Sequence, residues 1–256
     1  MDVLLGGLGP GMFALALAVA LVAGVVKGAV GFAMPMILAS GLGSLLAPEV
    51  ALAALILPTL VTNLWQAFRN GLRAALAAAW QVRVYLSIVV VLMVFSAQLV
   101  TLLPASALFL ALGLPVTLFA TAQLLGWRLK FRPEHRLRAE VIVAAVAGFI
   151  GGLSGVWGPP TVAYLTATDT PKADHMRIQG VIYGVGAVVL LAAHLRSGIL
   201  NAETAPLSAA LIVPALAGMA VGLRIGDRMD QERFRTATLA VLVVTGLNLV
   251  RRAFFA

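Results

Sequence analysis

The chain has no cysteine and few charged residues for its length. Its 256 residues include no Cys, 3 His and 10 Asp or Glu. Without cysteine it can form no disulfide bond, iron–sulfur cluster or thiolate metal site. The histidines, His135, His175 and His194, show no metal-ligand spacing. Charged residues make up 11% of the sequence, whereas a soluble domain has about 25%. These shortages argue against a soluble enzyme and against a metal or other cofactor.

Catalytic and nucleotide-binding motifs are missing as well. The sequence has no Gly-x-x-x-x-Gly-Lys-Ser/Thr phosphate loop, so the chain is not its own ATPase. It has neither a nucleophile–base constellation nor a helical His-Glu-x-x-His motif. The net charge of +8 comes mostly from loops between apolar segments, so it is a signal of membrane topology rather than of nucleic-acid binding.

What the sequence does contain is long uncharged runs, and 61% of its residues are hydrophobic. A helix needs roughly 20 apolar residues to cross a membrane. The runs predict an all-α, polytopic transmembrane protein in which residues 1–256 form a single membrane domain. The N-terminus lacks the basic region of a signal peptide, so we expect the first segment to be retained. The eight apolar segments are 10–43, 47–68, 80–102, 104–126, 140–168, 174–195, 204–224 and 233–251.

A thirteen-residue block occurs twice. Ala23–Pro35 returns as Ala147–Pro159 at a constant offset of 124, with five of the thirteen positions identical. Four apolar segments fall in each half, which defines repeat one (10–126), a basic linker (127–139) and repeat two (140–251). In hydrocarbon, a broken helix survives only where protein or a water-filled cavity satisfies its backbone. Matching Gly and Pro interruptions in two halves therefore point to the binding site of a transporter, on a Gly/Pro-broken or re-entrant helix in each repeat.

The orientation of the halves depends on the two segments that contain the block. If each segment crosses once, the repeats are parallel; if each is a re-entrant hairpin, they are inverted. Lys and Arg gather in cytoplasmic loops. The inverted arrangement places 14 of them inside and 3 outside, against 11 and 6 for the parallel one. We therefore expect inverted repeats with both termini outside, although Arg251 and Arg252 then lie outside.

The glycine breaks are the first candidates for a site. A half-helix begins with backbone N–H groups that have no intrahelical partner, at the positive end of the helix dipole, and this suits an anion. The alternative is close helix packing, which Gly24-x-x-x-Gly28 also fits. The substrate-binding candidates at the breaks are Gly28, Gly31, Ser154, Gly155, Trp157, Gly158 and Thr161.

Three polar side chains complete the candidate set. Lys27 is the one charge between Asp2 and Glu49, and an ionisable residue inside the membrane indicates function by default. Its alternative role is that of a lysine that reaches an interface. Asn63 and Gln179 lie on polar helix faces and could line a path, or they could serve as interhelical hydrogen-bonding groups.

The duplicated layout, the Ala-Gly-x-x-x-Gly-x-x-Gly…Pro block and the stretch Gly-Gly-Leu-Ser-Gly-Val-Trp-Gly-Pro-Pro at 151–160 resemble the TauE/SafE family of sulfite and sulfonate exporters. The resemblance extends over essentially the whole chain, but a lysine at position 27 is not part of it. It implies a multi-pass secondary carrier of the bacterial inner membrane that exports sulfite or an organosulfonate.

The expected function is therefore a secondary transporter, not an enzyme, that works by alternating access around the two broken helices. The alternatives are a carrier or channel for another small anion, such as a carboxylate, and a non-transporting subunit of a membrane complex. The expected partners are a small anionic substrate and the lipid bilayer, without nucleic acid; a homodimer stays open.

The charge distribution predicts that both termini face the outside of the membrane. A reporter that is active only in the cytoplasm should be silent when it is fused after Ala256, and it should be active when it is fused within the 127–139 linker. Activity of the Ala256 fusion would refute this orientation.

Overall fold

The structure is a computed structural model that describes residues 8–43, 45–97, 105–127, 133–154 and 157–255. Over this part of the chain the secondary structure is helical throughout, which confirms the all-α prediction. The helices are α1 (Pro10–Val30), α2 (Met34–Gly43), α3 (Pro48–Phe68), α4 (Leu72–Gln81), α5 (Arg83–Ala97), α6 (Ala105–Leu124), the 3-10 turn η1 (Pro133–His135), α7 (Arg136–Ser154), α8 (Gly158–Ala167), α9 (Lys172–Arg196), α10 (Ala205–Ala210), α11 (Ile212–Arg228) and α12 (Gln231–Phe255).

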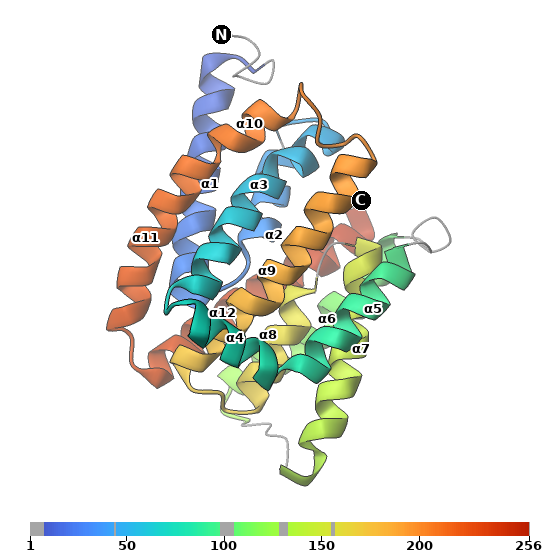
Figure 1. Cartoon of the computed structure of the whole chain (residues 1–256), viewed down its shortest axis with the longest axis vertical. Coiled ribbons are helices and arrows are strands. Elements are labelled where there is room, and N and C mark those ends of the chain that lie inside the picture. The colour runs from blue at the N-terminus through green and yellow to red at the C-terminus, as the bar shows by residue number, and fades with distance from the viewer. Residues whose placement is uncertain (1–7, 44, 98–104, 128–132, 155–156, 256) are drawn as a thin grey trace. The chain divides into compact units, whose positions relative to one another are not determined.

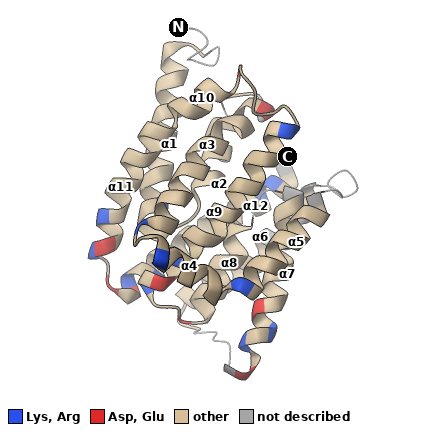
Figure 2. Ribbon diagram, viewed as in Figure 1, with Lys and Arg blue, Asp and Glu red and all other residues tan. Residues whose placement is uncertain are grey.

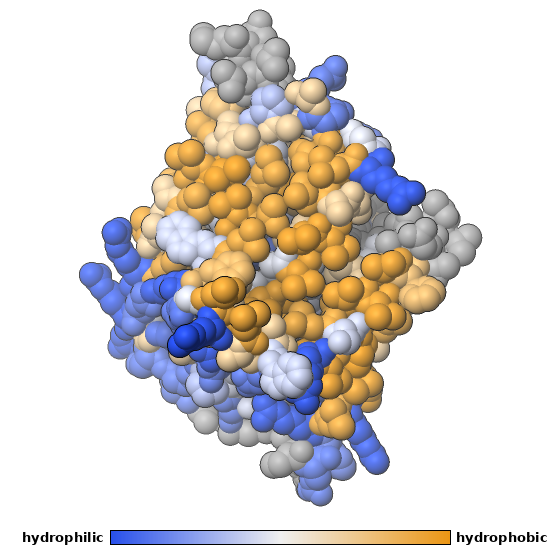
Figure 3. Space-filling model, in the orientation of Figure 1, coloured by the Kyte–Doolittle hydropathy of each residue, from blue (hydrophilic) through white to orange (hydrophobic). Residues whose placement is uncertain are grey.

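The helices are those of a polytopic membrane protein. In the described residues five helical stretches are long and apolar enough to cross a membrane, or six if the bent pair α4 and α5 counts as one span. Large apolar side chains are exposed along them, for example Val22 on α1 (56%) and Val244 on α12 (66%). Hydrophobic residues cover most of the middle of the face in Figure 3, and charged residues gather at helix ends in Figure 2. This distribution fits helices whose middles face lipid.

The chain divides into two compact units, and each contains helices from both halves of the sequence. Unit 1 consists of residues 1–72 and 180–229, and unit 2 consists of residues 73–179 and 230–256. Unit 1 thus holds α1, α2, α3, most of α9, α10 and α11, whereas unit 2 holds α4 to α8, the start of α9, and α12 (Figure 1).

The first apolar segment is a helical hairpin in unit 1, not a single crossing. α1 ends at Gly31, which has a left-handed φ of 89°, and Ala33 has a φ of 72°. α2 then turns back along α1, since a Cβ built on Gly41 would lie 2.5 Å from Val19 Cγ1. Gly41 lies eleven residues after Val30, and Val19 lies eleven residues before it. The chain therefore folds back on itself near Val30, and α2 runs antiparallel to α1.

The second copy of the block forms a similar hairpin in unit 2. α7 ends at Ser154 and α8 begins at Gly158. Tyr164 on α8 lies beside Glu140 near the start of α7, with the phenol hydroxyl 3.5 Å from a carboxylate oxygen. The predicted Gly/Pro break is therefore present in each half, and the chain turns back on itself at both breaks.

Equivalent helices of the two halves pack antiparallel. In unit 1, Gly180 on α9 meets Ala67 on α3, and Gly184 meets Leu64 and Asn63. Residues later in α9 thus contact residues earlier in α3, so the two helices are antiparallel. In unit 2, Gly113 on α6 meets Val250 on α12, whereas Thr117 meets Gly246. A parallel duplication would make both pairs parallel, so this packing is that of inverted repeats.

Ion pairs at helix ends agree with the inversion. In unit 1, Arg69 at the end of α3 pairs with Asp227 at the end of α11, at 2.6 Å. In unit 2, Arg235 of α12 pairs with Asp169, at 3.0 Å, and donates to Gln123 at the end of α6. Within each unit, the basic loops that the inverted arrangement assigns to one side of the membrane thus lie at one end.

Glycine brings α1 and α11 into backbone contact in unit 1. A Cβ on Gly218 would lie 2.0 Å from the carbonyl oxygen of Leu21, and one on Gly222 would lie 2.1 Å from that of Val25. Gly226 approaches Ala29 in the same way, so the two helices run parallel. The spacing Gly218-x-x-x-Gly222-x-x-x-Gly226 is a small-residue packing motif that the sequence analysis did not identify.

α3 contains Pro58, and a serine from another helix replaces the lost hydrogen bond. Proline has no N–H to donate to the carbonyl four residues earlier, which is that of Ala54. Ser208 Oγ donates to this carbonyl at 3.1 Å and accepts from the Leu57 N–H, also at 3.1 Å. Ser208 itself is fully buried, so α10 supplies the polar group that makes proline tolerable in α3.

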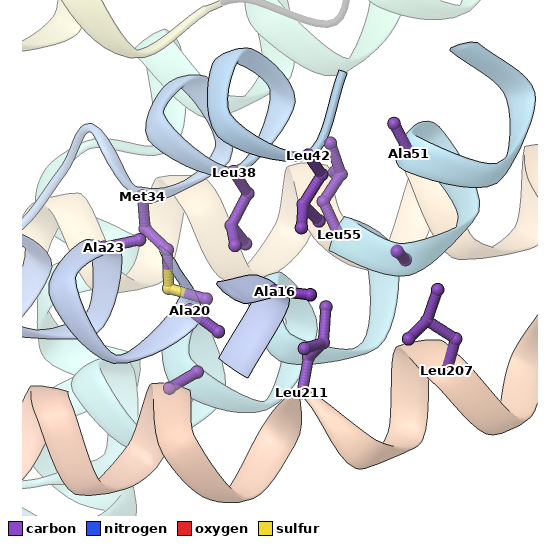
Figure 4. Packing of buried hydrophobic residues seen from close by; sticks show 12 residues of the cluster. Ala16, Ala20, Ala23, Met34, Leu38, Leu42, Ala51, Leu55, Leu207 and Leu211 are labelled. Atoms are coloured by element: carbon purple, nitrogen blue, oxygen red, sulfur yellow. The ribbon is translucent and has the colours of Figure 1, made fainter. Parts of the chain in front are cut away.

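The core of unit 1 lies where the hairpin meets α3 and the start of α11. Small residues of α1 allow the larger side chains of α2 to approach closely (Figure 4). Its buried members are Ala16, Ala20, Ala23, Met34, Leu38, Leu42, Ala51, Ala54, Leu55, Leu207, Leu211 and Ala215.

Two segment boundaries predicted from the sequence differ from the structure. Residues 72–81, placed before the predicted 80–102 segment, form α4, which is bent by 78° from α5. This ten-residue helix is too short to cross a membrane alone. It buries Ala75 and Ala78 and exposes Leu76 and Trp80. The predicted linker 127–139 is helical at its end, because η1 and the first turn of α7 lie within it.

The contact between α1 and α11 predicts that Gly222→Ala destabilises the protein. The new methyl group would meet the Val25 carbonyl, and overpacking of this kind costs about 1–3 kcal/mol. We expect a lower melting temperature for the variant in detergent. The control is Gly43→Ala, because that glycine is exposed and no atom lies within 4 Å of its Cβ position. Equal melting temperatures for parent and Gly222→Ala would contradict the packing.

Candidate functional site

Lys27 is buried in unit 1, one turn before the end of α1. Its exposed fraction is 1%, and its Nζ donates to Asn63 Oδ1 on α3 at 2.5 Å. The Nζ also lies 5.9 Å from the centre of the Tyr183 ring on α9. Among the described residues no carboxylate pairs with Lys27. We refer to Lys27, Asn63 and Tyr183 as the Lys27 cluster.

A second hydrogen bond holds the amide of Asn63 with its oxygen toward Lys27. Asn63 Nδ2 donates to the main-chain carbonyl of Tyr183 at 3.1 Å. Because the nitrogen is used in this way, the oxygen of the amide points to Lys27. The close crossing of α3 and α9 at Gly180, where a Cβ would lie 2.6 Å from the Ala67 nitrogen, allows this bond. Two of the substrate-binding candidates from the sequence, Lys27 and Asn63, are thus in direct contact, and their role in binding substrate stays a prediction.

The Lys27 cluster has capacity for an anion. A lysine ammonium has three donors, and Asn63 accepts one hydrogen bond from this group. An isolated charge is costly in a low-dielectric interior, and a hydrogen-bonded counter-charge offsets that cost. An anion with several oxygen atoms could accept the remaining donors and supply the counter-charge.

The glycines near Lys27 have structural roles in the fold. A Cβ on Gly28 would lie 2.3 Å from the carbonyl oxygen of Met219 on α11, so the packing alternative accounts for glycine at this position. Gly31 closes α1, and its N–H donates to the carbonyl of Lys27 at 2.6 Å. That N–H is therefore used within the chain. Contact of either residue with substrate stays a prediction.

A second polar cluster surrounds the start of α8 in unit 2. Thr161 is buried, and its hydroxyl lies 2.9 Å from the Tyr85 hydroxyl and 2.9 Å from the Trp157 carbonyl oxygen. Trp157 precedes α8 and is 6% exposed. Its indole Nε1 is buried and has no hydrogen-bond partner among the described residues. An unpaired buried donor costs about 1–3 kcal/mol, so this N–H is a candidate ligand for substrate.

The sequence analysis missed two tyrosines of this second cluster. Tyr85 on α5 stacks on Tyr164 of α8, with ring centres 5.8 Å apart and an angle of 24° between the rings. The sequence has only three tyrosines, and the third is Tyr183 of the Lys27 cluster. All three are at most 5% exposed. The rarity of tyrosine in an otherwise apolar chain is the signal that could have identified them.

The start of α8 offers fewer backbone donors than an ordinary helix start. Pro159 and Pro160 occupy its first turn and have no N–H. Two of the four N–H groups that a helix start normally leaves unpaired are therefore absent from this one. Ser154 is the last residue of α7, and Gly155 lies outside the described residues. A cation and side-chain donors therefore have to provide much of any anion binding.

Gln179 on α9 is fully buried, and its amide nitrogen and oxygen have no hydrogen-bond partner among the described residues. It lies four residues before Tyr183, on the same helix face. The polar candidates from the sequence thus form two groups, the Lys27 cluster of unit 1 and the cluster around Trp157 and Thr161 in unit 2. Gln179 is a further candidate, which lies between Thr161 and Tyr183 in the sequence.

The described residues contain no group of three or more His, Cys, Asp or Glu side chains placed to hold a metal ion. The two clusters consist instead of amide, hydroxyl, indole and ammonium groups. Such groups bind ligands through hydrogen bonds and charge.

Comparison with known proteins places the chain in a family. No curated protein and no solved structure matched it. The family model for the sulfite exporter TauE/SafE matches residues 16–249, from the first half of α1 to near the end of α12. The match includes both broken helices and both polar clusters. The chain thus belongs to the sulfite exporter TauE/SafE family, a family of membrane transporters rather than of enzymes.

Proposed function

We propose that this chain is a secondary transporter that exports a small sulfur-containing anion, such as sulfite or an organosulfonate, across the bacterial inner membrane. The observation that carries the proposal is Lys27, a buried lysine that pairs with no carboxylate among the described residues. A family of sulfite exporters supplies the substrate class, and the lysine supplies the charge that such a substrate needs.

The chemistry of the substrate fits that of the Lys27 cluster. Sulfite and sulfonate groups each present three oxygen acceptors on one sulfur atom. The ammonium of Lys27 can donate to two of them while it keeps its bond to Asn63. Such charge-assisted hydrogen bonds are short and strong. Trp157, Thr161 and Gln179 would line the path of the substrate.

Transport follows from the broken helices. The inverted hairpins α1–α2 and α7–α8 resemble the discontinuous helices around which transporters alternate access. The competing functions are a carrier or channel for a carboxylate and a subunit that transports nothing by itself. Flux of sulfite and acetate into liposomes that contain only this protein distinguishes all three.

The proposal predicts that removal of the cation weakens substrate binding. A close ion pair is worth a few kcal/mol at an effective dielectric constant near 20, and a loss of about 1.4 kcal/mol makes affinity tenfold weaker. We expect Lys27→Gln to weaken sulfite binding about tenfold or more, whereas Lys27→Arg keeps the charge and retains more affinity. Calorimetry on detergent-purified protein at fixed salt measures this.

A second variant separates charge from the mere presence of a lysine. Asn63→Asp would place a carboxylate within hydrogen-bond distance of Lys27, so the ammonium would already have a counter-charge in place of the substrate anion. We expect it to weaken binding as much as Lys27→Gln does. Lys172→Gln, at the start of α9, is the matched control and should bind like the parent. Full affinity in both Lys27→Gln and Asn63→Asp would exclude Lys27 as the anion's partner.

The unpaired indole predicts a contribution from unit 2. Trp157→Phe keeps an aromatic ring but removes the N–H, and a hydrogen bond to a charged group is worth about 1.5–3 kcal/mol. We expect sulfite affinity to fall about tenfold. Trp65→Phe is the control, because Trp65 is 39% exposed on α3. Unchanged affinity in Trp157→Phe would restrict the indole to packing.

A further inference from the structure

We infer that Lys27 carries a proton together with the transported anion. Its side chain is a neutral amine when the site is empty and becomes an ammonium when an anion binds. The inference rests on the proposed function of the same cluster and adds the co-transported ion.

The hydrogen bonding of Lys27 matches the neutral amine. An amine has two N–H groups and a lone pair, so one acceptor and a buried, otherwise apolar setting leave little unsatisfied. An ammonium has three N–H groups and a full charge. The described surroundings offer one amide oxygen at 2.5 Å and one ring whose centre is 5.9 Å away. These groups offset only part of the cost of an isolated charge within the membrane.

No charged group faces Lys27 from the described parts of the helices around it. α2 has no ionisable residue. On α3, Glu49 is exposed near the far end, and Asn63 is neutral. On α9 within unit 1, Tyr183 is the titratable neighbour, and His194 and Arg196 are three turns farther along the helix. The charged residues of α11 are all exposed, and they are Arg224, Asp227 and Arg228. A counter-charge for the ammonium therefore has to arrive with the substrate.

The transport cycle then balances as follows. On the loading side, the amine takes one proton from water as the anion binds, which forms an ammonium–anion pair. On the other side, the anion leaves and the ammonium returns its proton to water. One proton crosses with each anion, so a monovalent anion crosses without net charge.

Purified protein in liposomes with a pH-sensitive dye inside tests this. The probe is methanesulfonate, which stays a monoanion throughout the neutral pH range, so its own titration contributes no protons. With the membrane potential clamped at zero, an inward methanesulfonate gradient should acidify the interior by about one proton per labelled anion, as the ammonium–anion pair requires.

Two variants identify the group that carries the proton. In Lys27→Arg the guanidinium group cannot lose its proton. This variant should still exchange labelled methanesulfonate across the membrane, but it should no longer acidify the interior. Lys172→Gln should acidify it like the parent. Acidification by Lys27→Arg equal to that of the parent would overturn the inference.

The parent protein alone also decides the question. Methanesulfonate flux that follows the membrane potential and moves no protons would overturn proton coupling and leave the proposed transport function intact. The absence of both methanesulfonate and sulfite flux would overturn both.

Discussion

The whole structure depends on one constraint, which is that backbone N–H and C=O groups within a membrane need partners inside the protein. Each departure from a regular helix meets it locally. Where α1 ends, the Gly31 N–H bonds to the carbonyl of Lys27. Where Pro58 interrupts α3, Ser208 takes over the carbonyl of Ala54. Within unit 1, the end of α1 and the interruption of α3 thus both have backbone groups satisfied by the protein.

Buried polar side chains also need partners inside the protein, and several of them are grouped. The buried Lys27 cluster lies in unit 1 and the buried cluster around Trp157 and Thr161 lies in unit 2, and all three tyrosines of the chain belong to these clusters. Their rings combine apolar bulk with a single polar group, which suits a site that opens to water and closes again. The one buried cation of the described spans is in unit 1, whereas the buried indole N–H at Trp157 is in unit 2.

The sequence was sufficient for the features that depend on local chemistry. Uncharged runs identified the membrane segments, the doubled Gly and Pro block located both breaks, and the distribution of Lys and Arg favoured the inverted arrangement. It was not sufficient for α4, because ten apolar residues beside a longer run give no separate signal. The bond between Lys27 on α1 and Asn63 on α3 was equally hidden, because it depends on how two helices pack and not on a local pattern in the sequence.

The glycine contact between α1 and α11 also has a mechanical consequence. Side chains usually act as a deformable layer between helices, but here the two backbones touch directly at Gly218 and Gly222. Neither helix can slide or rotate without a collision of main-chain atoms, so α1 and α11 behave as one rigid helix pair. Lys27 belongs to this rigid helix pair, whereas Asn63 belongs to α3, which is interrupted by Pro58. Any step that separates the lysine from its amide partner therefore displaces α1 and α11 together or bends α3 at Pro58.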